Sequence, residues 1–486
     1  MTPEERAQID RMFEPRGLAV FGAVNSPGSF GQMNLMSQVR YGYRGRLYPV
    51  SPKGGELNGM KIYKSLEEID GPVDLASISV PAAAVPDVLK ACLARGVAGA
   101  QILTSGFAEL DDEQGRSLQE EIIRISRQGL RIVGPNCFGL HSPKGGITLI
   151  PGSSFSRERG GVAFISQSGG VAADFGFEVM MAGLGISKIA SFGNGVDLGA
   201  VELMEYLADD PDTEIIAAYL EGVRDGQRFI ETVRRTTARK PVVIWKGGLT
   251  PLGGQAARSH TGSLGGEAQV WEGALSQAGA VMVQGLDEIT DTLRGLAYLK
   301  RKGGRIALMG GGGAIGVFSC DLAYRYGLDM PIFSPETQAE LQKSFPTPGN
   351  SVRNPLDTGT PILPLEKVRV LAEQVLTREP IDILVLILLI RPLEVEIRTF
   401  MEFAGLEPPP RGAYLESLLE VLAPLKKSSG KDMVMVFDNR AYRPEDAEAE
   451  GMVREMRNRY QSEGIPVFPS AERALRGIRN ALRAWR

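Results

Sequence analysis

The stretch Val162-Ala163-Phe164-Ile165-Ser166-Gln167-Ser168-Gly169-Gly170 decides the fold class, because an apolar run passes directly into a turn of hydroxyl and glycine residues. We expect a buried strand over Val162–Ser166 and a helix over Gly170–Ala182. A strand, a tight turn and a helix in this order form the repeating unit of parallel α/β sheets. The sequence therefore predicts an α/β protein.

The same unit recurs in three series, which we assign to domains at residues 1–140, 150–300 and 304–486. The first series predicts a doubly wound, Rossmann-like domain, and the other two predict related flavodoxin-like domains. The remaining strands are expected at Leu18–Val24, Arg46–Val50, Leu75–Val80, Gly99–Thr104, Arg131–Val133, Ser187–Ser191, Ile215–Leu220, Val242–Lys246, Val281–Val283, Arg305–Met309, Ile383–Leu389 and Met433–Val436. We expect connectors at His141–Gly160 and Lys300–Gly304, and a loop between Gly247 and Arg258.

Composition excludes several classes of protein. The 54 basic and 58 acidic residues give a net charge of −4, without the basic excess of a general nucleic-acid-binding protein. Cys92, Cys137 and Cys320 are widely spaced, which excludes a disulfide framework and a Cys-x-x-Cys metal clip, and we expect no metal site. The longest apolar run, Ile381–Ile390, is too short to span a bilayer, and Met1–Arg6 is too polar for a signal peptide. We expect a cytoplasmic protein that binds neither nucleic acid nor a membrane.

His260 is one of 2 histidines in the chain and lies in Arg258-Ser259-His260-Thr261-Gly262-Ser263. A histidine in a packed core has Leu, Ile or Phe as neighbours, whereas small residues and hydroxyls leave this imidazole accessible. Hydroxyl and backbone N–H donors suit a phosphate better than a metal ion. The pattern favours a phosphate-handling histidine, and an exposed loop histidine is the alternative.

The turn Ser166-Gln167-Ser168-Gly169-Gly170 is a candidate phosphate site in the same series. Backbone N–H groups at a helix start converge on an anion, and a Cβ at the glycines would block its approach. An ordinary capped helix start is the alternative. Glu221 ends the strand Ile215–Leu220, where a carboxylate can hold an imidazole by its far N–H; a helix-capping or solvated glutamate is the alternative.

Two further glycine-rich turns raise the question of a nucleotide. Phe21–Gly31 follows the first expected strand but lacks the G-x-G-x-x-G spacing and the acidic ribose ligand of dinucleotide folds. Lys53, after the second strand, suits a ligand with additional phosphate such as coenzyme A, and a solvated lysine in a turn is the alternative. Gly311–Gly316 does match G-x-G-x-x-G and carries the hypothesis of an NAD(P)-dependent oxidoreductase. A lone match among 59 glycines is weak, and we interpret it as a tight strand–helix turn.

Together these motifs resemble the α subunit of the ADP-forming acyl-CoA synthetases (acetate–CoA ligases), relatives of succinyl-CoA synthetase. The resemblance covers nearly the whole chain, as a CoA-binding domain followed by two ligase domains. It rests on Gly134-Pro135-Asn136-Cys137, Ser166–Gly170, Gly193-Asn194-Gly195-Val196-Asp197, Ser259–Ser263 and Asn354-Pro355-Leu356-Asp357. One departure is Gly310–Gly313, where many relatives have an Asn-Ala-Gly-Gly type of turn.

The resemblance implies a reaction through an acyl phosphate and a phosphohistidine. His260 would be phosphorylated, Glu221 would steady its ring, and Ser166, Gln167, Ser168, Gly169 and Gly170 would bind the phosphoryl group. CoA, a substrate, would contact Gly22, Asn25, Gly31, Val50, Pro52, Lys53, Val80 and Pro81. The acyl or phosphate pocket would include Asn136, Gly193 and Asn194.

The resemblance also implies a partner. No ATP-grasp domain is recognised in this sequence, so we expect ATP or ADP, with Mg²⁺, on a separate ATP-grasp β subunit in a two-plus-two heterotetramer. The other substrate would be a small carboxylic acid. The competing hypothesis is a CoA-sensing regulatory module related to the ligase part of protein lysine acetyltransferases. Retention of His260 and Glu221 argues against it.

Overall fold

The computed structural model describes residues 1–22, 24, 26–261, 267–300, 303–345, 350–359, 363–438 and 447–485. The chain divides into two compact units, Met1–Ile289 and Thr290–Arg486. In the described residues of the first unit the strands form a five-stranded and a six-stranded sheet, and those of the second unit form a four-stranded sheet. The prediction of an α/β protein with parallel sheets is confirmed.

The first sheet has the strand order β2-β1-β5-β6-β7 and is parallel throughout. Its strands are β1 (Gly17–Gly22), β2 (Arg46–Val50), β5 (Leu75–Ser79), β6 (Gly99–Ile102) and β7 (Arg131–Val133). A short hairpin, β3 (Gly55–Leu57) and β4 (Met60–Ile62), follows β2. The helical elements are α1 (Pro3–Phe13), α2 (Phe30–Tyr41), η1 (Leu66–Glu68), η2 (Ala82–Ala84), α3 (Val85–Ala94), η3 (Ala108–Leu110) and α4 (Glu113–Ser126).

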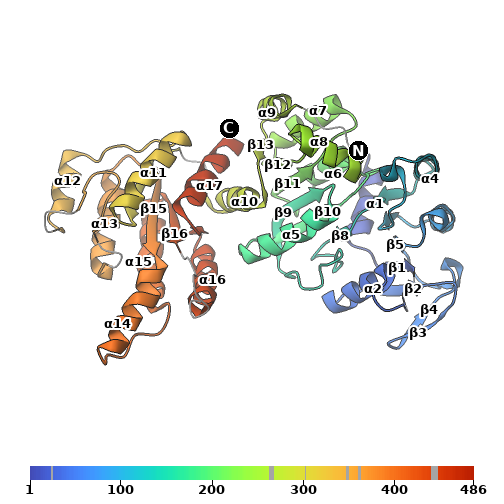
Figure 1. The fold of residues 1–486 in the computed structure, drawn as a ribbon, viewed down its shortest axis with the longest axis horizontal. Helices are drawn as coiled ribbons and strands as arrows, with labels where there is room; N and C mark the ends of the chain where they lie inside the picture. The colour runs from blue at the N-terminus through green and yellow to red at the C-terminus, as the bar shows by residue number, and fades with distance from the viewer. Residues whose placement is uncertain are drawn as a thin grey trace. The chain divides into compact units, whose positions relative to one another are not determined.

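Helices cover both faces of this sheet because successive residues of a strand point to opposite faces. On β1, Leu18 and Val20 belong to a core with residues of α1 and α2, whereas Ala19 and Phe21 belong to a core with residues of α3 and α4. Strands buried on both faces carry the continuous apolar runs that the sequence shows. In Figure 1 this part of the chain is blue to cyan.

The second sheet has the order β13-β12-β11-β9-β10-β8. Its strands are β8 (Gly139–His141), β9 (Arg159–Ser166), β10 (Ile186–Ser191), β11 (Ile215–Leu220), β12 (Val242–Lys246) and β13 (Val281–Val283). The helices are α5 (Gly169–Met181), α6 (Ala200–Ala208), α7 (Gly226–Thr237), α8 (Pro251–Thr261), α9 (Ala268–Gln277) and α10 (Leu286–Tyr298). Strand β8 pairs antiparallel with β10. The connector expected from His141 is therefore wrong at its start, because His141 belongs to a sheet strand.

The second unit has the parallel strand order β14-β15-β16-β17, shown in yellow to red in Figure 1. Its strands are β14 (Ile306–Gly310), β15 (Ile383–Leu389), β16 (Asp432–Asp438) and β17 (Val467–Phe468). The helical elements are α11 (Gly313–Arg325), α12 (Pro335–Gln342), α13 (Leu365–Arg378), η4 (Pro392–Glu396), α14 (Ile397–Phe403), α15 (Ala413–Ser429), α16 (Ala447–Ser462) and α17 (Ala471–Ala484). Residues of α13, α15 and α16 form one core with alternate residues of β14, β15 and β16.

Candidate functional site

The carboxyl edge of the second sheet gathers polar residues that follow three neighbouring strands. Ser166 ends β9, Glu221 follows β11, and Lys246 ends β12. Tyr219 pairs in register with Ser166, and Leu220 pairs with Lys246. Neighbouring strands lie about 4.8 Å apart, so these side chains meet at one edge. Ligands of open α/β sheets bind at such edges.

Helix α5 begins at this edge with an arrangement suited to an anion. Ser168 is the N-cap, and its hydroxyl accepts a hydrogen bond from the backbone of Val171 at 3.4 Å. The Ser166 hydroxyl accepts from the Ser168 N–H at 3.1 Å and donates to the Ser168 carbonyl at 2.7 Å. Gly169 and Gly170 occupy the first turn, where backbone N–H groups have no acceptor within the helix. A Cβ at Gly170 would meet nothing closer than the Ser168 hydroxyl, at 4.0 Å, so this end of the helix is accessible.

A cavity of about 490 Å³ joins this helix start to the first sheet. Its lining combines expected CoA-side and phosphate-side residues: Phe30, Ser79, Val80, Pro81, Leu103, Thr104, Ser105, Asn136, Cys137, Phe138, Gln167, Ser168, Gly169 and Gly170. None of these described lining residues has a charged side chain. An anion there would be held by N–H and hydroxyl dipoles. Glycine is required at Gly169, because a Cβ would lie 2.5 Å from the Phe138 ring.

Cys137 lines the same cavity but is not equipped as a nucleophile. Complete burial raises the pKa of its thiol to about 12, and the thiolate is the reactive form of cysteine. Its sulfur lies 3.2 Å from the carbonyl oxygen of Ile102 and donates to it. The thiol is therefore a packing group at neutral pH.

Glu221 is 4% exposed and is held on several sides. The hydroxyl of Tyr219 donates to its Oε1 at 3.1 Å. The side-chain oxygen of Gln167 accepts from the backbone N–H groups of Glu221 and Gly222, the latter at 3.0 Å. Lys246 donates from Nζ to the Glu221 carbonyl at 2.8 Å. The sequence placed Gln167 with the phosphate ligands, and the structure gives its side-chain oxygen this contact with the Glu221 backbone.

The structure separates the two asparagines of the expected acyl or phosphate pocket. Asn136 lines the 490 Å³ cavity, and its N–H donates to the Thr104 carbonyl at 2.9 Å. Gly193 has a φ of +51°, and a Cβ there would lie 2.2 Å from the carbonyl oxygens of Pro135 and Asn136. Only glycine therefore allows the two turns to approach each other.

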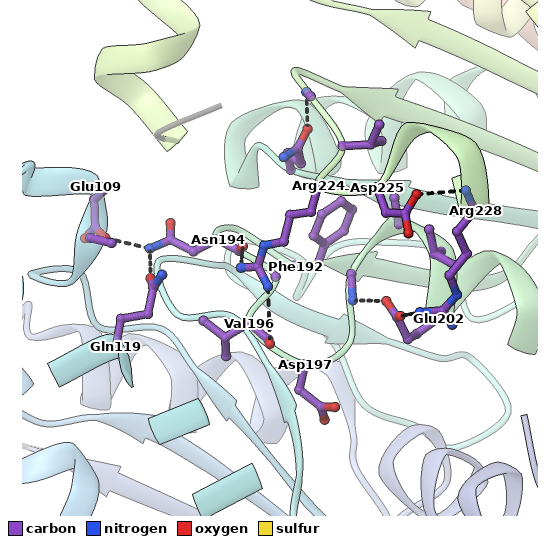
Figure 2. Close-up of a pocket in the computed structure, with 18 of the residues that line it drawn as sticks. Glu109, Gln119, Phe192, Asn194, Val196, Asp197, Glu202, Arg224, Asp225 and Arg228 are labelled. Carbon is purple, nitrogen blue, oxygen red and sulfur yellow. Dashed lines mark hydrogen bonds and ion pairs between the residues drawn. The ribbon is translucent and has the colours of Figure 1, made fainter. Parts of the chain in front are cut away.

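Asn194 points into a second cavity, of about 980 Å³, shown in Figure 2. Its Nδ2 donates to Glu109 Oε2 at 2.6 Å and to Gln119 Oε1 at 3.0 Å. Arg224 donates to the Asn194 carbonyl at 2.9 Å and to the Val196 carbonyl at 3.4 Å (Figure 2). Gln167 lines both cavities, which are thus adjacent at this side chain.

The expected CoA ligands in the first sheet lie at its carboxyl edge. Gly22, Val50 and Val80 end or follow the adjacent strands β1, β2 and β5. Gly22 has a φ of +140°, and a Cβ there would lie 2.9 Å from the carbonyl and hydroxyl oxygens of Ser79. Gly31 is buried in the first turn of α2.

The other expected CoA ligands are more exposed. Pro52 and Lys53 follow β2 and are exposed, as is Pro81 after β5. Asn25 lies outside the described residues.

His260 lies near the end of α8, where the structure describes its backbone only. The loop expected between Gly247 and Arg258 is therefore wrong from Pro251 onward. Within the helix, Gly253 packs closely, because a Cβ there would lie 3.3 Å from the Cα of Gly248. Helix α8 contacts η3, which carries Glu109. Gly262–Gly266 lie outside the described residues.

The other histidine, His141, has the apolar surroundings that His260 lacks in the sequence. It is fully buried, with its ring edge-on to Tyr41 and Phe155 at centroid distances of 5.4 and 5.2 Å. Burial lowers the pKa of its imidazole to about 3. His141 is therefore a neutral core residue.

Sequence reasoning missed Tyr219, Lys246 and Phe138. Tyr219 and Lys246 lie within expected strands, which were interpreted only as buried apolar segments and not as sources of functional side chains. The available signal was the strand period, since residues two apart share a face and Tyr219 precedes Glu221 by two. Phe138 follows the motif Gly134–Cys137 without a pattern of its own.

Among the described residues, no helix is long and apolar enough to cross a membrane. In the same part of the chain, no group of three or more His, Cys, Asp or Glu side chains is arranged to hold a metal ion.

Two families match the chain in sequence. A CoA binding domain matches residues 16–143, and a succinyl-CoA ligase like flavodoxin domain matches residues 159–296. Among curated proteins, the α subunit of acetate–CoA ligase [ADP-forming] II from Pyrococcus furiosus is 39% identical over 352 residues, which are 72% of this chain and 76% of that protein. The α subunit of enzyme I from the same organism is 35% identical over 362 residues, with the same coverage of 72% and 76%.

A solved structure matches nearly the whole chain. It is acetyl-coenzyme A synthetase 1 of Candidatus Korarchaeum cryptofilum, described as dinucleotide forming and in complex with phosphate and ADP. The TM-score is 0.79 at 29% identity, and the match covers 98% of this chain and 96% of that one. The predicted fold class, a Rossmann-like CoA-binding domain followed by flavodoxin-like ligase domains, is confirmed. The resemblance inferred from the motifs is also confirmed: this chain belongs to the family of ADP-forming acetate–CoA ligase α subunits.

Proposed function

We propose that this chain is the α subunit of an acid–CoA ligase that interconverts acyl-CoA, ADP and phosphate with a carboxylic acid, CoA and ATP. The observation that carries the proposal is the cavity of about 490 Å³, where Val80 and Pro81 lie with Ser168, Gly169 and Gly170. Transfer of an acyl group from a thioester to phosphate requires both reactants in one space. The family membership of the chain supports the same reaction.

In the first step a phosphate oxygen attacks the thioester carbonyl carbon, and the carbon–sulfur bond breaks to release CoA. The product is an acyl phosphate. The N–H groups of Gly169 and Gly170 and the hydroxyl of Ser168 hold the phosphate oxygens, with Ser166 and Gln167 shaping the turn. A helix start provides fixed dipoles for this charge, so a cationic side chain is not required.

In the second step an imidazole nitrogen of His260 attacks phosphorus, and the carboxylate leaves as the free acid. Glu221 accepts the hydrogen bond of the other ring nitrogen and stabilises the positive charge that develops on the ring. Such a carboxylate fixes both the tautomer and the orientation of a histidine. In the third step the phosphohistidine gives its phosphoryl group to ADP. Asn136, Gly193 and Asn194 are proposed to shape the acyl and phosphate pocket.

We propose that CoA lies across the carboxyl edge of the first sheet, against Gly22, Asn25, Gly31, Val50, Pro52, Lys53, Val80 and Pro81. The chain is proposed to have three domains, at residues 1–140, 150–300 and 304–486, of which the first binds CoA and the second carries the phosphohistidine. The nucleotide, with Mg²⁺, binds an ATP-grasp β subunit, and two copies of each chain form a heterotetramer. The designation of the Pyrococcus relatives as α subunits supports a separate partner.

The test is transfer of radiolabelled phosphate to the chain, either from ATP in the presence of the ATP-grasp partner or from inorganic phosphate in the presence of acetyl-CoA. The expected product is a base-stable, acid-labile phosphoprotein that the His260→Ala variant does not form. Label of equal strength on that variant would contradict the proposal. CoA binding without any label on the native chain would instead favour the CoA-sensing module.

A further inference from the structure

The hydroxyl of Tyr219 is placed to control the carboxylate of Glu221. It donates to Oε1 over 3.1 Å. Tyr219 is the last residue but one of β11, and Glu221 follows the strand, so the two side chains leave the same face. A phenol can donate to a carboxylate only while it keeps its proton. Burial, and then the neighbouring Glu221 charge, raise the pKa of Tyr219, which keeps it a donor at neutral pH.

Neighbouring residues fix the position of the Tyr219 ring. Trp245, its partner in register on β12, contacts it edge-on with ring centroids 4.7 Å apart and an interplanar angle of 66°. Gly247 leaves room for the hydroxyl, since a Cβ there would lie 2.7 Å from the hydroxyl oxygen. The hydroxyl therefore has a restricted place beside Glu221.

The backbone of Glu221 is fixed separately from its side chain. The Gln167 oxygen accepts from the N–H groups of Glu221 and Gly222, and the Lys246 ammonium donates to the Glu221 carbonyl and to the Gly247 carbonyl. Both Gln167 and Lys246 are buried. The main chain of Glu221 is held in this way, and the Tyr219 hydroxyl restricts the orientation of its side chain.

We propose that Tyr219 is a positioning residue for the reaction, which orients the Glu221 carboxylate for its contact with the histidine ring. This inference rests on the proposed function, in which Glu221 steadies His260. A hydrogen bond to a charged carboxylate is stronger than one between neutral groups, so it restricts the orientation of the group. Tyr219 acts through Glu221 and touches neither substrate nor phosphoryl group.

The test compares Tyr219→Phe with Tyr43→Phe in the complex with the ATP-grasp partner. Tyr43 is a matched control, because it is also half-buried and donates one hydrogen bond, to the Pro15 carbonyl at 2.8 Å. Each variant is assayed for the rate of phosphohistidine formation from labelled ATP and for CoA affinity. Tyr219→Phe is expected to slow phosphorylation roughly tenfold, as the loss of a hydrogen bond to a charged group does.

CoA affinity separates positioning from a general loss of structure, because CoA is proposed to bind at the first sheet. Without the Tyr219 hydroxyl the Glu221 carboxylate is less well oriented, so the rate of phosphorylation should fall while CoA affinity stays unchanged. Tyr43→Phe should leave both the rate and the CoA affinity unchanged. A native rate in Tyr219→Phe, or a loss of CoA affinity equal to the loss of rate, would overturn the inference.

A second variant keeps the inference testable if Tyr219→Phe folds poorly. Gly247→Ala retains the hydroxyl but displaces it from Glu221, so it should slow phosphorylation and leave CoA affinity unchanged. In the double variant Gly247→Ala/Tyr219→Phe the combined loss of rate, expressed as a free energy, should be smaller than the sum of the two single losses, because both act on one hydrogen bond. Full additivity would contradict the shared cause. Absence of label on the native chain would instead contradict the proposed function itself.

Discussion

The five strands of the first sheet and the five parallel strands of the second follow one another in the same order, but the carboxyl edges of the two sheets differ in chemistry. At the first edge Gly22, Val50 and Val80 present backbone and apolar surface, and the nearby Lys53 is exposed. At the second edge Glu221 and Lys246 are buried in a network of hydrogen bonds. The difference teaches that two sheet edges of one unit can present different surfaces, and under the proposed function the first receives CoA while the second fixes side chains for bond making. Changes at the two edges should therefore affect different steps.

The largest effect should follow from Glu221→Gln at the second edge. The amide keeps the shape of the side chain but loses the charge that is proposed to steady the histidine ring. Phosphohistidine formation should fall by on the order of 10²–10⁴-fold, with CoA affinity unchanged. The measurement is the rate of labelling from ATP, together with CoA binding by calorimetry.

Glu379→Gln in the second unit is a matched control for that variant. Glu379 is also a buried carboxylate, and it accepts from the Ser334 N–H at 3.1 Å. It should lose stability but keep the labelling rate. A native rate in Glu221→Gln would remove the distinction between the two edges.

Gly22→Ala, at the first edge, should weaken CoA binding and leave histidine phosphorylation intact. The added Cβ meets Ser79 oxygens at 2.9 Å in a backbone conformation with a φ of +140°. We expect a stability loss of about 1–3 kcal/mol and a clear loss of CoA affinity. Histidine labelling from acetyl phosphate, which needs no CoA, should continue.

Gly96→Ala provides the control for strain alone. Gly96 has a φ of +72°, and a Cβ there would have no neighbour within 4 Å. It lies between α3 and β6. Its alanine variant should lose stability through backbone strain and keep its CoA affinity. Equal CoA affinity in Gly22→Ala and Gly96→Ala would argue against a CoA site at the first edge.

Ser168→Ala and Ser470→Ala compare two helix N-caps of similar geometry. Ser168 accepts from the Val171 N–H at 3.4 Å, and Ser470 accepts from the Arg473 N–H at 3.2 Å. Each variant should lose about 1 kcal/mol of stability. Only Ser168→Ala should also slow phosphorylation, by roughly tenfold, because its hydroxyl is also proposed to bind the phosphate. The same rate loss in both variants would show that the effect is one of stability.

The smallest effect should come from Lys53→Ala. This side chain is exposed, and exposed charge pairs contribute about 0–1 kcal/mol. The Kd for CoA should rise by less than about fivefold, and the difference should shrink as salt screens the charge. A large loss of CoA affinity that does not depend on salt would contradict this prediction, because it would indicate a buried contact between Lys53 and CoA.

The regular parts of the fold were predictable because apolar runs buried on both faces leave a continuous signal. The strands Arg46–Val50, Ile215–Leu220 and Ile383–Leu389 have the bounds expected from the sequence. Strand β8 was not predictable, because Gly139–His141 is short and its pairing with β10 is a distant contact. Helix α8 was not predictable either, because it contains Gly253 and Gly254, which look like loop composition in a sequence, although Gly253 packs closely against Gly248.

The candidate site was predictable in its motifs but not in its contacts. The sequence selected Ser168 and Glu221 because hydroxyls, glycines and a carboxylate follow strands. It could not assign Gln167 to the Glu221 backbone, since this contact depends on β9 and β11 being neighbours. The strand order β12-β11-β9 supplies that information. The contact of Tyr219 with the Glu221 side chain lies within one strand run, and the strand period was its signal.

The central claim is that His260 carries the phosphoryl group, and site mapping of the labelled chain tests it most directly. The native chain would be incubated with acetyl-CoA and radiolabelled phosphate, then digested under alkaline conditions that preserve phosphohistidine. The account predicts label on the peptide that contains His260, and none on that peptide in the His260→Ala variant. Label on any other residue, or undiminished label in the variant, would contradict it.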